Sequence, residues 1–161
     1  MTSRLHSLVS PRTYYFTVRL SDPGSDLLVA HIALLRDCVR LARQTDPFTI
    51  DHAVVLPNRL HMIWTLPEDD GDYGRRWTAI KRSFAQHVPV KLSGTSGNSA
   101  IWQRRYWECP VTTAAEMAHY VEAIAQAPVE DGLVRRPGLW PYSSLWTARV
   151  RASRQPLRAA C

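Results

Sequence analysis

The sequence is poor in cysteine and in long apolar runs, and each shortage excludes a class of protein. Its three cysteines, Cys38, Cys109 and Cys161, are odd in number and lack metal-ligand spacing, so neither a disulfide framework nor a zinc site is predicted. No stretch approaches the roughly 20 apolar residues that a membrane-spanning helix needs. The N-terminal residues also lack the apolar segment of a secretory signal, so a reduced, cytoplasmic location is expected.

Acidic residues are absent from residue 132 onward, which makes the distribution of charge strongly asymmetric. Elsewhere the 14 basic residues match the 14 acidic residues in number, so the whole net charge of +6 belongs to this segment. An arginine-rich segment of this kind attracts polyanions, above all nucleic acid. A solubilising tail is the alternative interpretation. The arginines of the segment are Arg135, Arg136, Arg149, Arg151, Arg154 and Arg158.

Length and composition favour a single globular domain. With 161 residues, of which 45% are hydrophobic, the chain can bury a sizeable core. We therefore predict one domain over residues 1–161, with an irregular arm over 1–12 and a basic extension over about 132–161. The centre of the domain is the segment 49–67, where two apolar runs meet at a Pro57-Asn58 turn and predict a β-hairpin.

The second strand of this hairpin carries a chemically versatile pair, Arg59 and His61. Successive side chains of a strand point to opposite faces, so these two share the face opposite to the apolar side chains of Leu60, Met62 and Trp64. The apolar side chains predict the core face of the hairpin, and Arg59 and His61 are expected on its opposite surface. Taken alone, His61 fits a half-buried structural histidine as well as a functional one.

The remaining segments follow the periodicities of helices and strands. Residues 13–20 and 101–111 are rich in aromatic or β-branched side chains and predict the first and last strands. Apolar side chains three to four residues apart predict helices over about 26–45 and 73–88, and residues 91–100 predict a Gly/Ser-rich loop.

A capping box from Thr113 to Glu116 predicts a third helix over about 114–127, which Pro128 is expected to end. An extended, packed C-terminal segment is expected after it. The element order is β-α-β-β-α-β followed by a helix. It indicates an α+β fold of the ferredoxin-like split βαβ type, in which helices pack on an antiparallel sheet.

Two stretches combine basic and aromatic residues in ways that suit nucleic acid. The predicted helix over 73–88 carries basic side chains opposite its apolar stripe. The segment 101–111 interleaves arginines with tryptophan and tyrosine, which suits stacking on unpaired bases beside bound phosphate. A solvated helix face and buried strand aromatics are the respective alternatives.

Six segments, taken in their order and spacing, resemble the REP-associated tyrosine transposases, a family of single-tyrosine HUH transposases. The segments are YYFTVRL, DHAVVLPNRLHMIWTLPEDD, RRWTAIKRSF, IWQRRYWE, APVEDGLV and WPYSS, and the resemblance covers roughly residues 13–145. It implies cleavage of single-stranded DNA beside small hairpins. In such enzymes a His-x-His strand motif binds a divalent metal that polarises the scissile phosphate, and a helix tyrosine attacks that phosphate.

Matched residue by residue, the resemblance implies an incomplete site. The His-x-His motif corresponds to Arg59-x-His61, and an arginine cannot bind a metal because its guanidinium has only donors and stays charged. The family's tyrosine corresponds to Ala123, and an asparagine that serves as an extra metal ligand corresponds to Ala127. Tyr120, one turn earlier on the same helix face, is the only candidate left for the nucleophile, and it would be displaced.

Three functions are consistent with these residues, and the first is favoured. A transposase-derived, non-catalytic protein would bind hairpin or single-stranded DNA without a metal cofactor, with Arg59 holding a phosphate where the metal sat. The alternative is an active endonuclease that uses Tyr120, His61 and Mg²⁺ or Mn²⁺. A third is a scaffold whose sheet binds a protein.

The favoured function implies a set of partners and contacts. DNA is the expected partner, membranes are not, the location would be the cytoplasm or the nucleoid, and self-association is left open. The predicted DNA-binding residues are Arg59, Arg75, Arg76, Lys81, Arg82, Trp102, Arg104, Arg105, Arg135 and Arg136.

Overall fold

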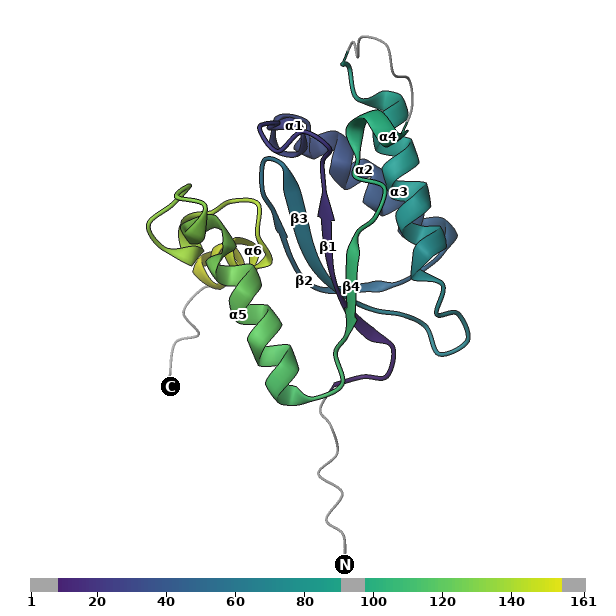
Figure 1. Ribbon diagram of the computed structural model, residues 1–161. Helices are drawn as coiled ribbons and strands as arrows, with labels where there is room; N and C mark the ends of the chain where they lie inside the picture. Colours follow the sequence, from purple (N-terminus) through teal and green to yellow (C-terminus); the bar gives the residue numbers. More distant parts are fainter. Residues whose placement is uncertain (1–8, 91–97, 155–161) are drawn as a thin grey trace, which may run out of the picture.

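A computed structural model of the protein describes residues 9–90 and 98–154 (Figure 1). Most of the predicted arm over 1–12, most of the predicted loop over 91–100, and Arg158 lie outside the described residues. Within the described ranges, no helix is long and apolar enough to cross a membrane. The elements are β1 (Thr13–Arg19), α1 (Leu27–Ala30), α2 (Ile32–Thr45), β2 (Thr49–Val55), β3 (Arg59–Thr65), α3 (Tyr73–His87), α4 (Asn98–Ile101), β4 (Trp107–Pro110), α5 (Ala114–Glu130), η1 (Pro137–Leu139) and α6 (Ser144–Arg154).

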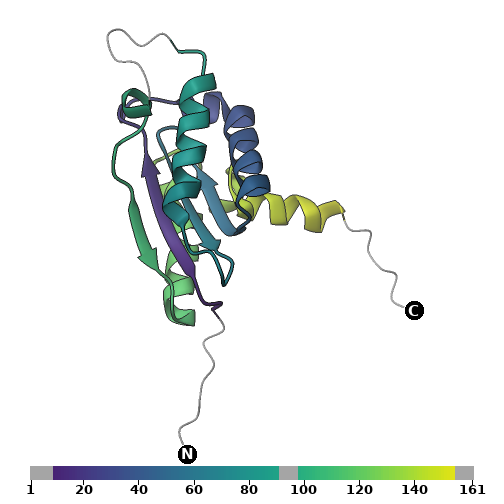
Figure 2. The same cartoon turned by 90° about the vertical axis from the view of Figure 1, so that its right-hand side faces the viewer.

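The four strands form one antiparallel sheet in the order β2-β3-β1-β4. The predicted hairpin pairs β2 with β3, and β1 lies between β3 and β4. Each helical crossover, from β1 to β2 and from β3 to β4, skips one strand, which is the ferredoxin-like split βαβ arrangement that the sequence predicts. Figures 1 and 2 show α2 and α3 on one face of the sheet and α5 on the other.

The face toward α2 and α3 holds the larger core. Leu60, Met62, Trp64 and Leu66 are all buried there, as strand alternation predicts. Trp64 stacks on Trp77 of α3, with 4.2 Å between the ring centroids. Because aromatic side chains bury large apolar areas, this cluster stabilises the packing of the sheet against α2 and α3.

The opposite face is not an open surface, so the prediction that Arg59 and His61 lie on a surface of the hairpin is wrong for His61. Helix α5 packs its Ile124 and Ala127 against Val54 of β2 and Ile63 of β3, and these side chains form a second, smaller core. His61 lies at the border of this core and is only 8% exposed. Arg59 and His61, which were predicted to lie on a surface, are therefore partly covered by α5.

The helix predicted over 26–45 is two helices. Its backbone breaks at His31, where φ is −117° and ψ is 41°. The break lets the short α1 carry Leu28 into the core, where this side chain is fully buried and its backbone N–H donates to the carbonyl of Pro57. A tertiary contact thus overrides the local helical pattern.

Helix α5 begins at the predicted capping box, but it continues through Pro128 to Glu130. Pro128 has no N–H to donate to the carbonyl of Ile124, so the helix continues past it with one intrahelical hydrogen bond fewer. The helix ends just before Gly132, which follows the C-cap residue Asp131 and whose φ of +72° is strained for residues with a side chain. Hydrogen bonds from Gly132 N to Val129 O and from Leu133 N to Pro128 O, both 2.9 Å, complete a Schellman motif.

The last strand is shorter than the predicted 101–111, because residues 101–103 are drawn onto α3. The indole N–H of Trp102 donates to the carbonyl of Lys81 at 3.1 Å, and the Lys81 ammonium donates to the carbonyl of Gln103 at 2.9 Å. Trp102 therefore forms only an isolated bridge, with Leu20, before β4 begins at Trp107.

The C-terminal segment is not extended, contrary to prediction. After the short η1 turn, Ser143 bridges to Val54 at the edge of the sheet, and α6 starts at Ser144. The Ser144 hydroxyl accepts from the backbone N–H of Ala53 at 3.2 Å, which fixes the start of the helix on β2. Figure 2 shows α6 running outward from this attachment.

Candidate functional site

His61 is held by two side chains of the neighbouring strand β1 and by one side chain of its own strand, β3. Its Nδ1 lies 2.8 Å from the Thr17 hydroxyl and 2.9 Å from the Tyr15 hydroxyl, and its Nε2 accepts a hydrogen bond from Arg59 Nε at 3.2 Å. A guanidinium can only donate, so Nε2 is unprotonated and the proton of the neutral ring belongs to Nδ1. Burial, followed by the charges of Arg59 and Arg19, lowers the pKa of His61 to about 4.

Arg59 fills the space between His61 and the end of α5. Its two terminal nitrogens bind both carboxylate oxygens of Asp131, at 2.7 and 2.9 Å, in a bidentate pair. This hydrogen bonding lowers the pKa of Asp131. Because Asp131 is the C-cap residue of α5, the pair ties that helix to β3. A fixed cation thus occupies the motif position at which the resemblance implies a metal-binding histidine.

The residues at this position do not fit a metal ion. The only ring nitrogen of His61 with an available lone pair already accepts from Arg59, and the positive guanidinium repels a second cation. Within residues 9–90 and 98–154, no group of three or more His, Cys, Asp and Glu side chains is arranged to hold a metal. No step of a reaction can therefore be assigned to a metal at Arg59 and His61.

The two alanines at the other motif positions contribute no functional groups. Ala127 is buried in the second core beside Ile63 and Ile124, where its methyl group packs against the sheet. Ala123 is half-buried, one turn before Ala127 on α5. The helix therefore lies on the sheet as an apolar cover, without a hydroxyl or an amide at either position.

Tyr120, the remaining candidate nucleophile, is engaged elsewhere. Its hydroxyl donates to Cys109 Sγ of β4 at 3.0 Å, and its ring stacks on Tyr15 with 4.3 Å between centroids. The hydrogen bond with Cys109, together with burial, raises the pKa of Tyr120 to about 12. Formation of the attacking phenolate is therefore unfavourable. The hydroxyl also points to β4, whereas His61 is on β3, two strands away.

Tyr15 is the tyrosine that contacts His61, and the sequence analysis missed it. Its buried side chain lies between the rings of Tyr120 and His61, and burial raises the pKa of its hydroxyl. Strand alternation could have found it. Tyr15 and Thr17 are two residues apart on β1, and Thr17 pairs directly with His61 across the sheet, so all three share one face.

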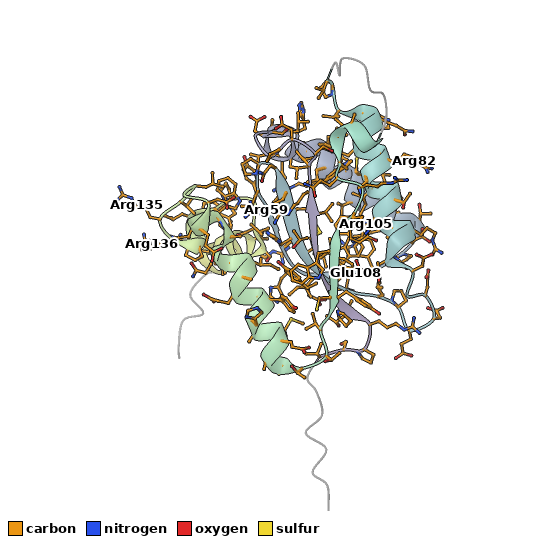
Figure 3. All side chains as sticks on the ribbon, in the orientation of Figure 1. Arg59, Arg82, Arg105, Glu108, Arg135 and Arg136 are labelled. Atoms are coloured by element: carbon orange, nitrogen blue, oxygen red, sulfur yellow. The ribbon has the colours of Figure 1, made fainter. Side chains whose placement is uncertain are left out.

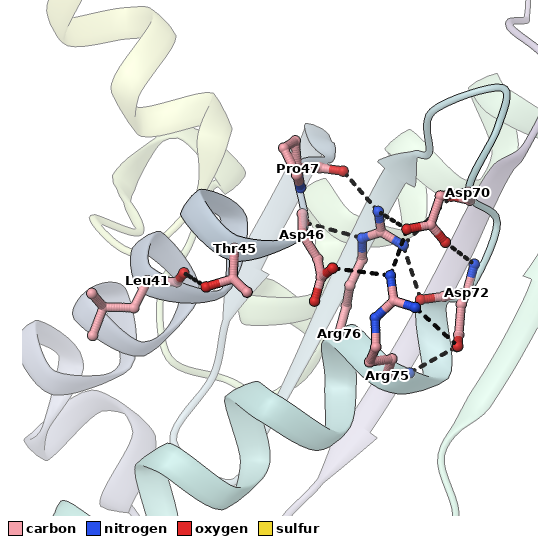
Figure 4. Close-up of polar contacts among 8 residues, drawn as sticks. All are labelled: Leu41, Thr45, Asp46, Pro47, Asp70, Asp72, Arg75 and Arg76. Carbon is pink, nitrogen blue, oxygen red and sulfur yellow. Dashed lines mark hydrogen bonds and ion pairs between the residues drawn. The ribbon is translucent and has the colours of Figure 1, made fainter.

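Three of the predicted DNA-binding residues are core residues in this structure, and their assignment to DNA contacts is corrected. Trp102 and Arg76 are each 1% exposed, and Lys81 is 6% exposed. Trp102 and Lys81 are fixed by the hydrogen bonds that draw residues 101–103 onto α3. Arg76 donates to the carbonyls of Asp46 and Asp72 at 3.1 and 2.9 Å (Figure 4).

The other predicted basic residues are accessible to different degrees. Arg75 is half-exposed and forms ion pairs with Asp46, Asp70 and Asp72. Figure 3 shows Arg105 beside β4, Arg82 on the outer side of α3, and Arg135 with Arg136 on the loop beyond α5. The exposed predicted residues are Arg75, Arg82, Arg104, Arg105, Arg135 and Arg136.

The neutral state of His61 leads to a prediction about pH. In the unfolded chain an imidazole ionises near pH 6.5, whereas His61 in the folded chain should stay neutral down to about pH 4. Protons then favour the unfolded state as the pH falls below 6.5. This residue should therefore lower the free energy of unfolding by up to about 3 kcal/mol between pH 6.5 and 4.

NMR titration of the histidine Cε1–H signals measures this directly, with the His61 signal assigned as the one missing from His61→Gln. The signals of the other histidines serve as internal references. A His61 midpoint near pH 6.5 would contradict the burial and hydrogen bonding described above.

The sheet order, with α5 covering the face that carries Arg59 and His61, defines an α+β protein of the ferredoxin-like split βαβ class. The chain is 36% identical over 132 residues to the REP-associated tyrosine transposase of Escherichia coli K12. The aligned region covers 82% of this chain and 75% of that protein. It is also 31% identical over 137 residues to a putative REP-associated tyrosine transposase of Haemophilus influenzae. That alignment covers 81% of this chain and 78% of the relative. The chain therefore belongs to the REP-associated tyrosine transposase family.

A solved structure agrees with this assignment. A REP-associated tyrosine transposase bound to a REP hairpin superposes with a TM-score of 0.79 at 32% sequence identity, over 100% of this chain and 92% of that one. No protein-family model matches the sequence.

Proposed function

We propose that this chain binds hairpin or single-stranded DNA and does not cleave it. One observation carries the proposal: the Arg59 guanidinium lies between His61 Nε2 and the Asp131 carboxylate, where the resemblance implies a metal. Ala123 and Ala127 support it, because neither supplies a nucleophile or a ligand. The related transposase of known structure is bound to a REP hairpin, and this supports DNA of that kind as the partner.

The alternative, an active endonuclease using Tyr120 and His61 with Mg²⁺ or Mn²⁺, has weaker support. It requires the Tyr120 hydroxyl to leave Cys109 and His61 Nε2 to leave Arg59. The proposed function requires neither change, since phosphate can be bound by the exposed arginines. It also includes no metal cofactor, so DNA binding should not require Mg²⁺: replacing EDTA with Mg²⁺ at matched ionic strength should not strengthen it.

Binding should depend steeply on salt, because phosphate contacts release counterions. On single strands, the slope of log affinity against log salt is expected to be about −0.7 for each phosphate contacted. The double variant Arg135→Gln/Arg136→Gln should flatten the slope by about 1.4 if each arginine holds one phosphate. Fluorescence anisotropy with labelled hairpins from the flanks of this chain's own gene measures both quantities, and denaturing gels of the same mixtures report cleavage.

The matched control is Arg36→Gln/Arg40→Gln, which removes two exposed charges from α2 and should leave the slope almost unchanged. Absence of binding to every hairpin and single strand at low salt would refute the DNA-binding function and favour a protein scaffold.

A further inference from the structure

A pocket of about 420 Å³ lies at the edge of the sheet, between α2, β2 and the segment that leads into α6 (Figure 2). It is on the face of the sheet that holds the larger core, whereas Arg59 and His61 are on the opposite face. Its volume falls within the range for ligand pockets, about 300–1,000 Å³. The residues that matter for its chemistry are Ile32, Arg36, Arg40, Arg43, Ile50 and Ala53.

Three side chains of β2 form the apolar floor of this pocket. Ile50, Ala53 and Val55 pair with residues of β3 whose side chains lie in the larger core, so all three point to the same face. The register shift between Ile50 and His52 keeps them there, although Ile50 and Ala53 are three residues apart. Because β2 is an edge strand, α2 covers this floor only in part, and Ile50 and Ala53 are half-buried.

The rim of the pocket carries positive charge. Arg36, Arg40 and Arg43 are exposed and lie on one side of α2, because they are four and three residues apart. Within residues 9–90 and 98–154, the side chain of Arg36 forms no hydrogen bond or ion pair. Arg40 pairs with the exposed Asp37, and Arg43 donates its Nε to the carbonyl of Phe48 at 2.9 Å. No carboxylate side chain of the described chain lines the pocket, so its rim suits an anion.

The wall opposite α2 is fixed to the strand by backbone donors. The N–H of Val55 donates to the carbonyl of Tyr142 at 2.8 Å, and the N–H of Ala53 donates to the Ser144 hydroxyl at 3.2 Å. Both donors of the sheet edge at the pocket are therefore occupied, and a peptide cannot add to β2 there as a further strand. The pocket is also preformed, which reduces the entropy lost when a small ligand binds.

We propose that this pocket binds a small amphipathic anion, an alkyl or aryl carboxylate. The apolar body of the ligand contacts Ile32, Ile50 and Ala53, and its carboxylate is bound by the arginines of the rim. Charge complementarity supports this class of ligand, because an apolar floor below a positive rim favours a carboxylate over a cation with the same apolar body. The inference goes beyond the proposed function, since it involves the other face of the sheet and does not require DNA.

Methyl NMR of the full-length protein labelled at isoleucine tests the pocket, with octanoate as the probe. Ile32 and Ile50 line the pocket, whereas Ile63 and Ile80 are fully buried elsewhere and serve as internal references. Octanoate should shift the Ile32 and Ile50 signals to saturation and leave the two references unchanged. Octylammonium, which has the same alkyl chain and the opposite charge, should cause no saturable shift over the same concentrations.

Two variants separate the rim from the floor. Arg36→Gln/Arg40→Gln should weaken octanoate binding by about 2- to 30-fold, the range for loss of two exposed ion pairs. Ala53→Met fills the floor and should abolish the saturable response, while unchanged Ile63 and Ile80 signals show that the protein is folded. The matched control, Arg135→Gln/Arg136→Gln, removes two charges elsewhere and should leave octanoate binding unchanged.

A pocket without a saturable response to octanoate, or one that responds equally to octylammonium, would overturn the inference. So would a response that persists in Ala53→Met. Ile32 and Ile50 signals that shift with protein concentration in the absence of octanoate would assign the pocket to a second copy of the chain, and would also overturn it. These results leave the proposed function intact, because that function fails only if hairpins and single strands do not bind.

Discussion

Replacing Arg76 with leucine is expected to lower the free energy of unfolding by about 3 kcal/mol, the scale for loss of a buried charged partner. The guanidinium is 1% exposed and donates to four backbone carbonyls, those of Asp46, Pro47 and Asp72 at 2.9–3.1 Å and that of Asp70 at 3.5 Å. It also reaches the Asp70 carboxylate at 3.2 Å. Leucine would fill much of the volume and leave these acceptors without a donor. Urea denaturation followed by circular dichroism measures the loss.

Arg75 provides the matched control, because it directly precedes Arg76 on α3 and forms ion pairs with the same three aspartates, Asp46, Asp70 and Asp72. Its side chain is 48% exposed, so solvent can replace the lost contacts, and Arg75→Leu should be much less destabilising than Arg76→Leu. Equal losses from the two substitutions would show that the carbonyl contacts of Arg76 contribute little.

The hairpin and the third helix could be predicted because their signals are local. Strand alternation around Leu60 and Trp64 identified the core face, and the Thr113–Glu116 capping box marked the start of α5. Both hydrogen bonds of the box are present in the structure. Such signals depend only on neighbouring residues, so they hold regardless of the tertiary contacts that the rest of the chain makes.

The buried basic residues were mispredicted because residue type was weighted above position. Arg76 and Lys81 each lie one residue from a member of the apolar stripe, beside Trp77 and Ile80 respectively. On a helix such positions border the stripe, and a long side chain there can lie along the core and reach a distant backbone carbonyl. The acceptors of Arg76 come from two separate loops, and no local pattern indicates that they meet.

The sequence was enough to predict which residues occupy the motif positions of the site, but not which residues they contact. The positions of Arg59 and Ala127 follow from the motif alone. The partner of Arg59 is Asp131, 72 residues away, and only the docking of α5 brings the two together. This contact changes the interpretation of Arg59, because Asp131 neutralises its charge and fixes its position.

The unmodified protein is expected to produce neither nicked DNA nor a denaturation-resistant adduct with labelled hairpins, in the presence of Mg²⁺ or Mn²⁺. An adduct requires a tyrosine oxygen in line with the scissile bond and a cation on the phosphate. Tyr120 donates its hydroxyl to Cys109 and has a pKa of about 12, and Tyr15 is buried against His61. An adduct that disappears on Tyr120→Phe or Tyr15→Phe would refute the non-catalytic function.

The combined variant Arg59→His, Ala123→Tyr and Ala127→Asn should acquire metal-dependent cleavage from an undetectable baseline. Losing the guanidinium frees His61 Nε2. The new side chains supply a second imidazole on β3, and a hydroxyl and an amide on α5. Full activity is not expected, because Ala127 is buried and misplacement of about 1 Å can cost on the order of a hundredfold in rate. The control is the same variant with Ala123→Phe, which keeps the ring and removes the nucleophile. Cleavage that persists with phenylalanine at position 123 would show that another group attacks the phosphate, and the assignment of the lost nucleophile to Ala123 would then be wrong.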